Sequence, residues 1–184
     1  MHQRLTPELS AILGYSRDEA MRTGHYGVAI DHLLLAILRH ADNDATSTLK
    51  GLGAELGELK AHIDSQVFRE QGIPFGDESR IRLTKRSAAV LNMAVYESLR
   101  FRQEVTGASH LLLAISRSQD FSAAGWLEER GITYEALKSY MFAHGMLSPE
   151  GDNVMPKAED IADALEAEIR AALATTGIST DYVS

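Results

Sequence analysis

An internal duplication constrains the fold of this chain more than any other feature of its sequence. The segment Asp31–Ile37 recurs as Ser109–Ile115, and a constant offset of 78 residues relates the two copies without a gap. When residues 5–63 are laid on 83–141, 19 of the 59 aligned pairs are identical. Chance does not keep an identical run of six residues in register with a dozen scattered matches. We therefore predict two similar structural units in tandem.

Each copy has the pattern of four helices. In the first copy, Thr6 is a good N-cap and Gly24 a good stop for the first helix. The run 33–38 is apolar on every side, which predicts a buried central helix. Shorter helices are expected at about 45–52 and 56–68. Because no stretch alternates apolar and polar residues, we expect no strand.

Composition divides the chain into four parts. Residues 1–68 hold the first repeat and 83–144 the second. The segment 69–82 between them is rich in glycine, proline, aspartate and serine, which is typical of a linker. Residues 145–184 begin with a second linker, and a further helix is expected at about 157–174.

The C-terminal tail is the most acidic part of the molecule. Of the formal net charge of −8, residues 145–184 carry −6, from eight acidic and two basic residues. The apolar residues of the predicted tail helix recur every four positions: Ile161, Leu165, Ile169 and Leu173. Because an isolated helix of this length is marginal in water, it needs a partner. The partner is the repeats, another copy, or the groove of a second protein, and residues 178–184 are expected to be frayed.

Composition also excludes several classes of function. The chain has no cysteine, which excludes disulfides, thiolate metal sites and a cysteine nucleophile. The acidic balance and the lack of a basic run argue against nucleic acid as a partner. The apolar run 33–38 is far shorter than the roughly 20 residues that span a bilayer. With no apolar signal segment visible at the N-terminus, we expect a cytoplasmic protein without a membrane partner.

Several short motifs of the first copy resemble a known family. They are Thr6-Pro7, Asp18-Glu19-Ala20, Gly24-His25-Tyr26 and the run that follows Asp31. Together they resemble the Clp repeat domain, which is the N-terminal double repeat of Clp-type protein-unfolding ATPases. The resemblance covers about residues 5–144. It implies an all-α fold of two tandem four-helix Clp repeats in a pseudo-twofold arrangement, with an additional C-terminal helix.

The chain departs from the family pattern at several positions. Ala29 replaces the usual glycine, and Asp31 replaces glutamate. The second copy has Ser109 at the acidic position and lacks the Gly-His-x-Tyr segment. No Gly-x-x-x-x-Gly-Lys-Ser/Thr loop is present, so we expect neither nucleotide nor another cofactor to bind. The chain is either a stand-alone Clp repeat protein or an excised piece of a longer one.

The resemblance also implies candidate binding residues. In some Clp repeat domains, the threonine that opens the first helix and the acid before the histidine contribute to binding phosphorylated arginine. Those positions are Thr6 with Asp31 in the first copy, and Thr84 with Ser109 in the second. They are candidates for binding phospho-arginine or a peptide. The alternative is that both threonines are N-caps and that Asp31 caps its own helix.

His32 and His110 are the histidines that recur in both copies. We expect them to be structural, each bonded to a neighbouring backbone group at the start of a buried helix. A metal site is not expected, because His25, His32 and His40 lack the spacing of a helical ligand pair. The alternative is a small enzyme that uses His32 or His110 as a base, although no nucleophile accompanies either residue.

The leading hypothesis is a non-enzymatic interaction module of the Clp chaperone and protease system. It would bind a substrate polypeptide, an adaptor, or a Clp ATPase or protease core, and so regulate proteolysis. The alternative is a regulatory N-terminal domain excised from a full-length Clp ATPase. A small basic cluster is either a solvated face or a docking site for an acidic segment: Arg80, Arg82, Lys85 and Arg86. The oligomeric state stays open.

Overall fold

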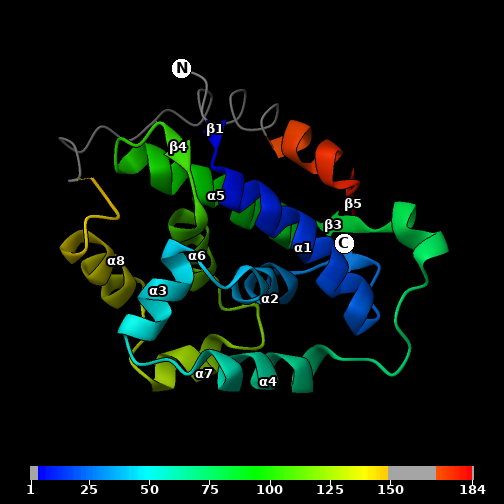
Figure 1. Ribbon diagram of the computed structural model, residues 1–184, viewed down its shortest axis with the longest axis horizontal. Coiled ribbons are helices and arrows are strands. Elements are labelled where there is room, and N and C mark those ends of the chain that lie inside the picture. The colour runs from blue at the N-terminus through cyan, green and yellow to red at the C-terminus, as the bar shows by residue number, and fades with distance from the viewer. Residues whose placement is uncertain (1–3, 149–168, 184) are drawn as a thin grey trace.

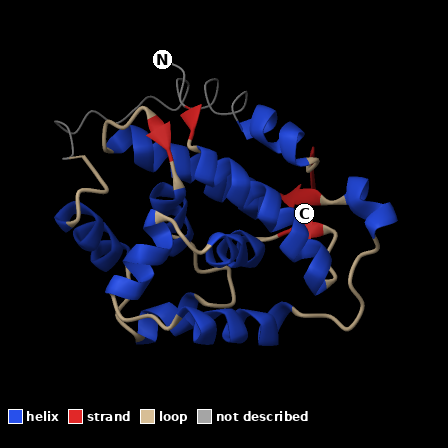
Figure 2. Ribbon diagram, viewed as in Figure 1, coloured by secondary structure: helices blue, strands red, loops and turns tan. Residues whose placement is uncertain are grey.

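Helices make up almost all of the regular structure in the computed structural model, which describes residues 4–148 and 169–183 (Figures 1 and 2). The first repeat contains α1 (Pro7–Thr23), α2 (Ile30–His40), α3 (Asp44–Gly51) and α4 (Leu56–Val67). The second contains α5 (Lys85–Arg100), α6 (Ala108–Ser116), α7 (Ala124–Glu129) and α8 (Tyr134–Ala143). The prediction of an all-α fold with four helices in each repeat is confirmed.

The first helix of each repeat starts alike but ends differently. Thr6 caps α1, because its hydroxyl accepts a hydrogen bond from the Leu9 amide at 3.1 Å. The helix stops at Gly24, whose φ is +85°. A Cβ at this position would lie 2.4 Å from the carbonyl oxygen of Gln71, so only glycine fits. Arg102 takes the equivalent place in the second repeat, with a φ of +54°.

Two short parallel strand pairs join the repeats crosswise. β1 (Arg4–Leu5) pairs with β4 (Val105–Thr106), and β2 (Gly27–Val28) pairs with β3 (Arg82–Thr84). The expectation of no strand was wrong, because strands of two or three residues are too short to show alternation. The offset of 78 relates the two pairs, because β3 is the equivalent of β1 and β4 is the equivalent of β2. The two repeats are therefore related by a pseudo-twofold axis.

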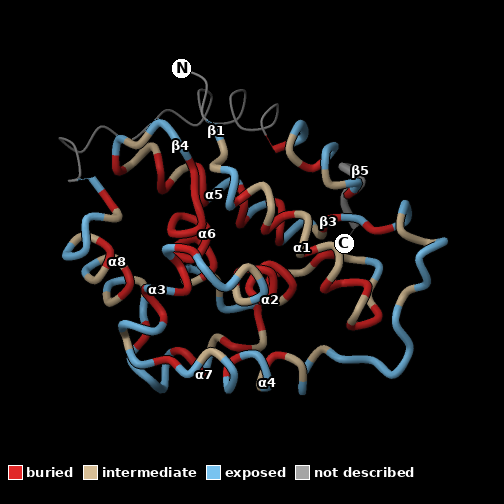
Figure 3. The backbone as a smooth tube through the Cα atoms, in the orientation of Figure 1, coloured by how far each residue is buried: buried red, intermediate tan, exposed pale blue. Residues whose placement is uncertain are grey.

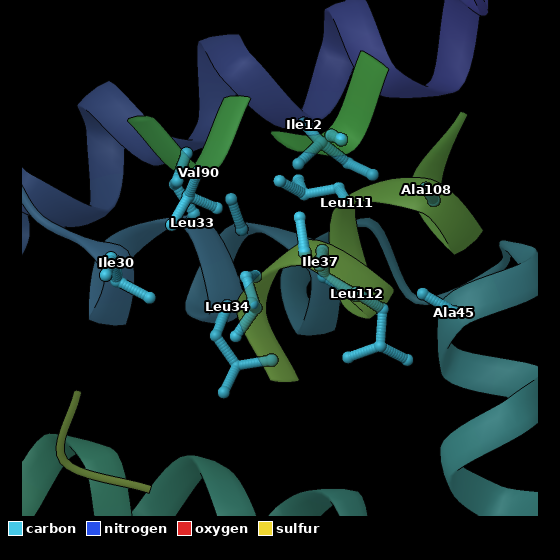
Figure 4. Packing of buried hydrophobic residues seen from close by; sticks show 14 of the residues in the cluster. Ile12, Ile30, Leu33, Leu34, Ile37, Ala45, Val90, Ala108, Leu111 and Leu112 are labelled. Atoms are coloured by element: carbon cyan, nitrogen blue, oxygen red, sulfur yellow. The ribbon is translucent and has the colours of Figure 1, made fainter. Parts of the chain in front are cut away.

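The central helices α2 and α6 lie at the middle of one hydrophobic core. Every residue of 33–37 and of 111–115 is buried (Figure 3). Figure 4 shows Leu33, Leu34 and Ile37 of α2 beside Leu111 and Leu112 of α6. Side chains of α1 and α5 cover them, and the buried apolar residues of both repeats form a single cluster. Because the repeats share this core, neither buries its apolar surface alone.

The C-terminal segment folds back onto the repeats. Residues 169–176 are helical, with Ile169 and Leu173 buried. Arg17 of α1 donates a hydrogen bond to the Thr176 carbonyl oxygen at 2.5 Å. The chain then forms β5 (Ser179–Val183), which extends the sheet beside β3, so the expectation of frayed residues there was wrong. Ile161, Leu165 and most of the predicted helix at 157–174 lie outside the described residues.

The segment between the repeats is ordered by short-range structure. The predicted linker 69–82 contains a 3-10 helix, η1 (Phe75–Arg80), and continues directly into β3. Glu78 of η1 forms an ion pair with Arg17 at 2.7 Å, and this arginine also holds Thr176. One side chain of α1 therefore ties the inter-repeat segment and the C-terminal segment to the first repeat.

Candidate functional site

The crosswise strands place the two threonines beside helices of the opposite repeat. Thr6 lies next to the start of α6, where a Cβ on Gly107 would come within 3.3 Å of the Thr6 methyl group. The register Val28–Leu83 brings Thr84 level with Ala29, at the start of α2. The structure therefore groups these residues across the repeats, since Thr6 lines one cavity with Ser109 and Thr84 lies level with the start of the helix that holds Asp31. Contacts between residues of different repeats cannot be predicted from the local sequence.

Asp31 does not cap its own helix. The N-cap of α2 is Ala29, and Asp31 is the second residue of the helix. Its carboxylate oxygen Oδ1 accepts hydrogen bonds from the backbone amide and the hydroxyl of Ser122, at 2.8 and 2.6 Å. Ser122 precedes α7 in the second repeat. Asp31 therefore serves as a bridge between the repeats.

His32 is held by both of its ring nitrogens. Nδ1 accepts a hydrogen bond from the Ala29 amide at 2.9 Å, so the ring proton must lie on Nε2. Nε2 lies 2.9 Å from the hydroxyl oxygen of Thr23 and donates to it. Burial, with smaller contributions from His25 and Arg22, lowers the pKa of His32 to about 3. The ring is therefore neutral, and its arrangement is the one that a structural role requires.

His110 repeats this geometry with a different second partner. Nδ1 accepts from the Gly107 amide at 2.9 Å, and Nε2 donates to the Gln103 side-chain oxygen at 2.6 Å. Burial lowers the pKa of His110 to about 4. A general base needs a free lone pair to remove a proton. In both His32 and His110 the Nδ1 lone pair already accepts a hydrogen bond, so this geometry does not favour the enzyme hypothesis.

A buried carboxylate recurs in both repeats, and its electrostatic role was not predicted. Glu97 lies fully buried, where Arg117 donates to it at 2.5 Å and the Tyr134 hydroxyl at 2.8 Å. Burial and the hydrogen bond to Glu97 raise the pKa of Tyr134 to about 12. Glu19 is the equivalent residue of the first repeat, with Arg22 at 2.7 Å and Arg39 at 3.7 Å. These pairs are structural.

A polar cavity of about 290 Å³ lies between the repeats, where the N-terminal ends of α1, α3 and α6 meet. We call it the acidic cavity, because it contains three carboxylates and its described lining contains no lysine or arginine. It brings together Thr6 and Ser109 from the predicted set, but neither Asp31 nor Thr84. Its lining is Thr6, Glu8, Asp42, Asn43, Asp44, Ser47, Gln103, Val105, Gly107, Ala108, Ser109, His110 and Met146.

A hollow on the other side of the pseudo-twofold axis overlaps the equivalent of the acidic cavity but has different chemistry. A more apolar hollow of about 240 Å³ is lined there by Ile30, Arg86, Ala89, Val90, Met93, Ala114, Arg117, Ser118 and Asp120. The offset of 78 places Arg86 where the acidic cavity has Glu8, and Asp120 where it has Asp42. Arg86 and Asp120 form an ion pair at 3.8 Å. We call this place the Arg86 hollow.

The predicted basic cluster divides between two surroundings. Arg80 stacks over the ring of Tyr26 at 4.7 Å and pairs with Asp77 at 3.5 Å. Arg86 lies at the Arg86 hollow. Arg82 and Lys85 are exposed, Arg82 within β3 and Lys85 at the start of α5, and β5 pairs with β3. The end of the tail therefore runs beside the cluster.

Sequence reasoning missed the three carboxylates of the acidic cavity. Asp42 had a usable signal, because Asp42 and Asp120 are one of the identical pairs of the duplication. The sequence signal for Asp44 was weaker. The offset aligns Asp31 with Ser109 and Asp44 with Ser122, so acid and hydroxyl exchange places between the repeats. Only the Asp31–Ser122 contact reveals that these four positions face one another.

Within the described ranges 4–148 and 169–183, no group of three or more histidine, aspartate or glutamate side chains is placed to hold a metal ion. Nor does any helix there combine the length and the apolar character needed to cross a membrane.

Comparisons with known proteins agree with this architecture. The family model of the Clp repeat (R) N-terminal domain matches residues 4–130. The N-terminal domain of the caseinolytic protease-associated chaperone ClpD from Arabidopsis thaliana superposes with a TM-score of 0.58 at 18% identity. The match covers 77% of this chain and 96% of that domain. At this identity, the likeness establishes the fold.

Similar sequences occur within much longer proteins. The chaperone protein ClpB of Oceanobacillus iheyensis is 26% identical over 133 residues, as is the negative regulator of genetic competence ClpC/MecB of Bacillus subtilis. A ClpA homologue of Cyanidium caldarium, an ATP-binding subunit of the ATP-dependent Clp protease, is 28% identical over 139 residues. These matches cover 72–76% of this chain but only 16% of each relative.

Proposed function

The chain belongs to the family of Clp repeat N-terminal domains, and from this premise we propose that it is a non-enzymatic module that binds other proteins in the Clp chaperone and protease system. Its partner is a substrate polypeptide, an adaptor, or a Clp ATPase or protease core. Binding regulates the proteolysis or chaperone activity of that partner. The proposal places the protein in the cytoplasm.

The acidic cavity is the observation that carries this proposal. It lies where the two repeats meet, and two of the four residues implicated by the family resemblance, Thr6 and Ser109, line it. Its size suits one side chain of a bound polypeptide. Asp31 and Thr84 lie at the other interface, where Ser122 already occupies one oxygen of the Asp31 carboxylate. The two interfaces are therefore unequal candidates for peptide binding, and the acidic cavity is the stronger.

A second candidate follows from the length of the relatives. Because the chain spans 16% of the curated relatives it matches, it is also suited to be the regulatory domain of a longer Clp ATPase. The same protein-binding surface would then control which substrates reach that ATPase. Reading the open reading frame on both sides of these 184 codons separates the two arrangements.

A reconstituted degradation assay tests the proposal. The full chain is added in molar excess to a Clp ATPase and Clp protease from the same organism, and degradation of fluorescein-labelled casein is followed. We expect the rate to change and the chain to co-elute with a Clp component in gel filtration. Serum albumin at the same concentration is the control. An unchanged rate together with separate elution would contradict the proposal.

A further inference from the structure

The charge of the acidic cavity defines the kind of group that it can hold. Glu8, Asp42 and Asp44 are all exposed at its wall. His110 does not offset them, because its hydrogen bonds hold the ring neutral. A group with positive charge is therefore attracted to this cavity, and a phosphate is repelled.

Two of the carboxylates lie at helix N-termini. Glu8 lies in the first turn of α1, and Asp44 is the first residue of α3. The positive end of a helix dipole stabilises a carboxylate in its first turn. The N-termini of α1 and α3 therefore already have their negative partners, so they do not call for an anionic ligand.

A hydroxyl of a largely buried residue in the same wall is open to a ligand. Ser109 is only 4% exposed, and its side chain lines the cavity. No hydrogen bond joins its hydroxyl to another residue of the described ranges 4–148 and 169–183. The hydroxyl oxygen is not among the fully buried polar atoms that lack a partner, so it is open to the cavity and available to a group that enters it.

The duplication shows why this place is open. At the other interface, the Asp31 carboxylate and the Ser122 hydroxyl bond to each other at 2.6 Å. The equivalent residues here are Ser109 and Asp44. They line one cavity, yet no hydrogen bond connects them within the part of the chain that the structure describes. A donor with several N–H groups would bridge this carboxylate and this hydroxyl.

The rim of the cavity also suits a long side chain. Val105 is 43% exposed, and Met146 is half-buried beside it. The methylene groups of a basic side chain can pack on such residues while the charged end reaches the carboxylates. The planar guanidinium matches a carboxylate with two parallel hydrogen bonds, which an ammonium group cannot do.

From these observations, we propose that the acidic cavity binds the side chain of an unmodified arginine of a partner polypeptide. Asp44 and Ser109 contact the guanidinium, and Glu8 and Asp42 contribute their charge. The inference rests on the proposed protein-binding function and names the side chain that the site recognises. It also predicts one such site for each chain, because the Arg86 hollow has the opposite charge pattern.

Fluorescence anisotropy with labelled peptides tests this inference on the full chain. The probes are acetylated, amidated glycine–serine peptides that carry one arginine, citrulline or phospho-arginine at the same position. We expect the arginine peptide to bind at least about tenfold more tightly than either of the others, since one charge-assisted pairing is at stake. Added salt should weaken the binding. Amide NMR shifts should cluster at residues 6–8, 42–47 and 107–110.

Matched variants from the two repeats provide the control. Asp44→Asn and Ser109→Ala should each weaken binding of the arginine peptide, Asp44→Asn by about tenfold. Asp42→Asn should weaken it less, and Asp120→Asn, at the equivalent position of the Arg86 hollow, should leave it unchanged. Circular dichroism checks that each variant is folded.

The outcomes separate this inference from the proposed function. Equal binding of the citrulline and arginine peptides would overturn the charge argument, although protein binding would still stand. Tighter binding of phospho-arginine would overturn it as well and would return the site to the anion-binding chemistry implied by the family resemblance. Failure of the casein assay alone would remove the Clp partner but not the arginine site.

Discussion

The acidic cavity and the Arg86 hollow overlap in part when the pseudo-twofold axis is applied, yet they share little chemistry. At the cavity, Glu8 and Asp44 add negative charge, and the Ser109 hydroxyl has no described protein partner. At the hollow, Arg86 pairs with Asp120, and elsewhere at the same interface Asp31 is bonded to Ser122. The crosswise strands that frame both places are the same. Duplication thus preserved the backbone of two sites, and substitution closed one and left the other open.

The largest expected effect tests whether the repeats are one cooperative unit. Leu33 and Leu111 are equivalent, fully buried and part of one core. Changing either to alanine should lower the free energy of unfolding by about 2–5 kcal/mol. Trp126, the single tryptophan, lies in the second repeat. In urea unfolding, Leu33→Ala should therefore shift the Trp126 fluorescence transition as much as the circular dichroism transition. A fluorescence transition that keeps its wild-type midpoint would mean that the repeats unfold separately.

The two histidines should make stability fall in acid. Their pKa values in the folded protein, about 3 and about 4, lie below the ordinary value of 6.5, so the unfolded chain binds more protons. Stability is therefore complete above pH 6.5 and decreases as the pH falls. Each histidine should contribute a loss of about 3 kcal/mol by pH 4, and below that pH only His32 continues to contribute.

Single variants isolate each histidine. His32→Asn and His110→Asn keep an acceptor near the position of Nδ1 but do not titrate. Urea unfolding at a series of pH values should show a shallower loss of stability for each variant than for the wild type. Parallel curves for wild type and His32→Asn would contradict the assigned ring geometry.

The buried carboxylates should respond alike despite their different partners. Glu19→Gln and Glu97→Gln each remove the charge from a buried group that accepts from arginine. We expect a loss of about 2 kcal/mol in each case, because hydrogen bonds to charged groups are worth roughly 1.5–3 kcal/mol. Chemical unfolding measures it, and the exposed Glu8→Gln should stay within about 0.5 kcal/mol of the wild type. A loss in one repeat only would show that the two clusters are not equivalent.

The smallest effect concerns the end of the first helix in each repeat. Arg102 has a φ of +54°, at the position where the first repeat has Gly24. A left-handed conformation costs a side chain about 1–2 kcal/mol, while glycine adds about 0.4–1 kcal/mol of unfolded-state entropy. Arg102→Gly should therefore stabilise the protein by less than about 1 kcal/mol. Arg102→Ala, which keeps the Cβ, is the matched control for the thermal unfolding measurement.

Local signals predicted the helices well. The caps at Thr6 and Gly24 and the apolar run 33–38 each depend on neighbouring residues, which a sequence displays directly. Because the second repeat aligns with the first, the same helices were predicted for it. The alternating pattern that announces a strand does not develop over two residues, so the crosswise pairs were not foreseen.

The candidate site was harder to predict than the fold. Thr6 and Ser109 were identified through family resemblance, which grouped them by repeat, whereas the structure places each beside the opposite repeat. The bond between Asp31 and Ser122 joins residues 91 positions apart. Asp44 attracts no attention in the sequence, since an aspartate in a first helical turn is ordinary. Its significance arises only from facing Ser109 across the interface.

The crosswise strands also bear on how such a chain could arise. A single repeat presents one strand before its first helix and another before its second, and in the double repeat each pairs with the other repeat. A protein made of one repeat could satisfy both strands only by meeting a second copy through a self-complementary, twofold interface. The double repeat therefore has the strand arrangement that such a homodimer would have. Because both halves belong to one chain, their sequences can differ, which a dimer of identical subunits does not allow.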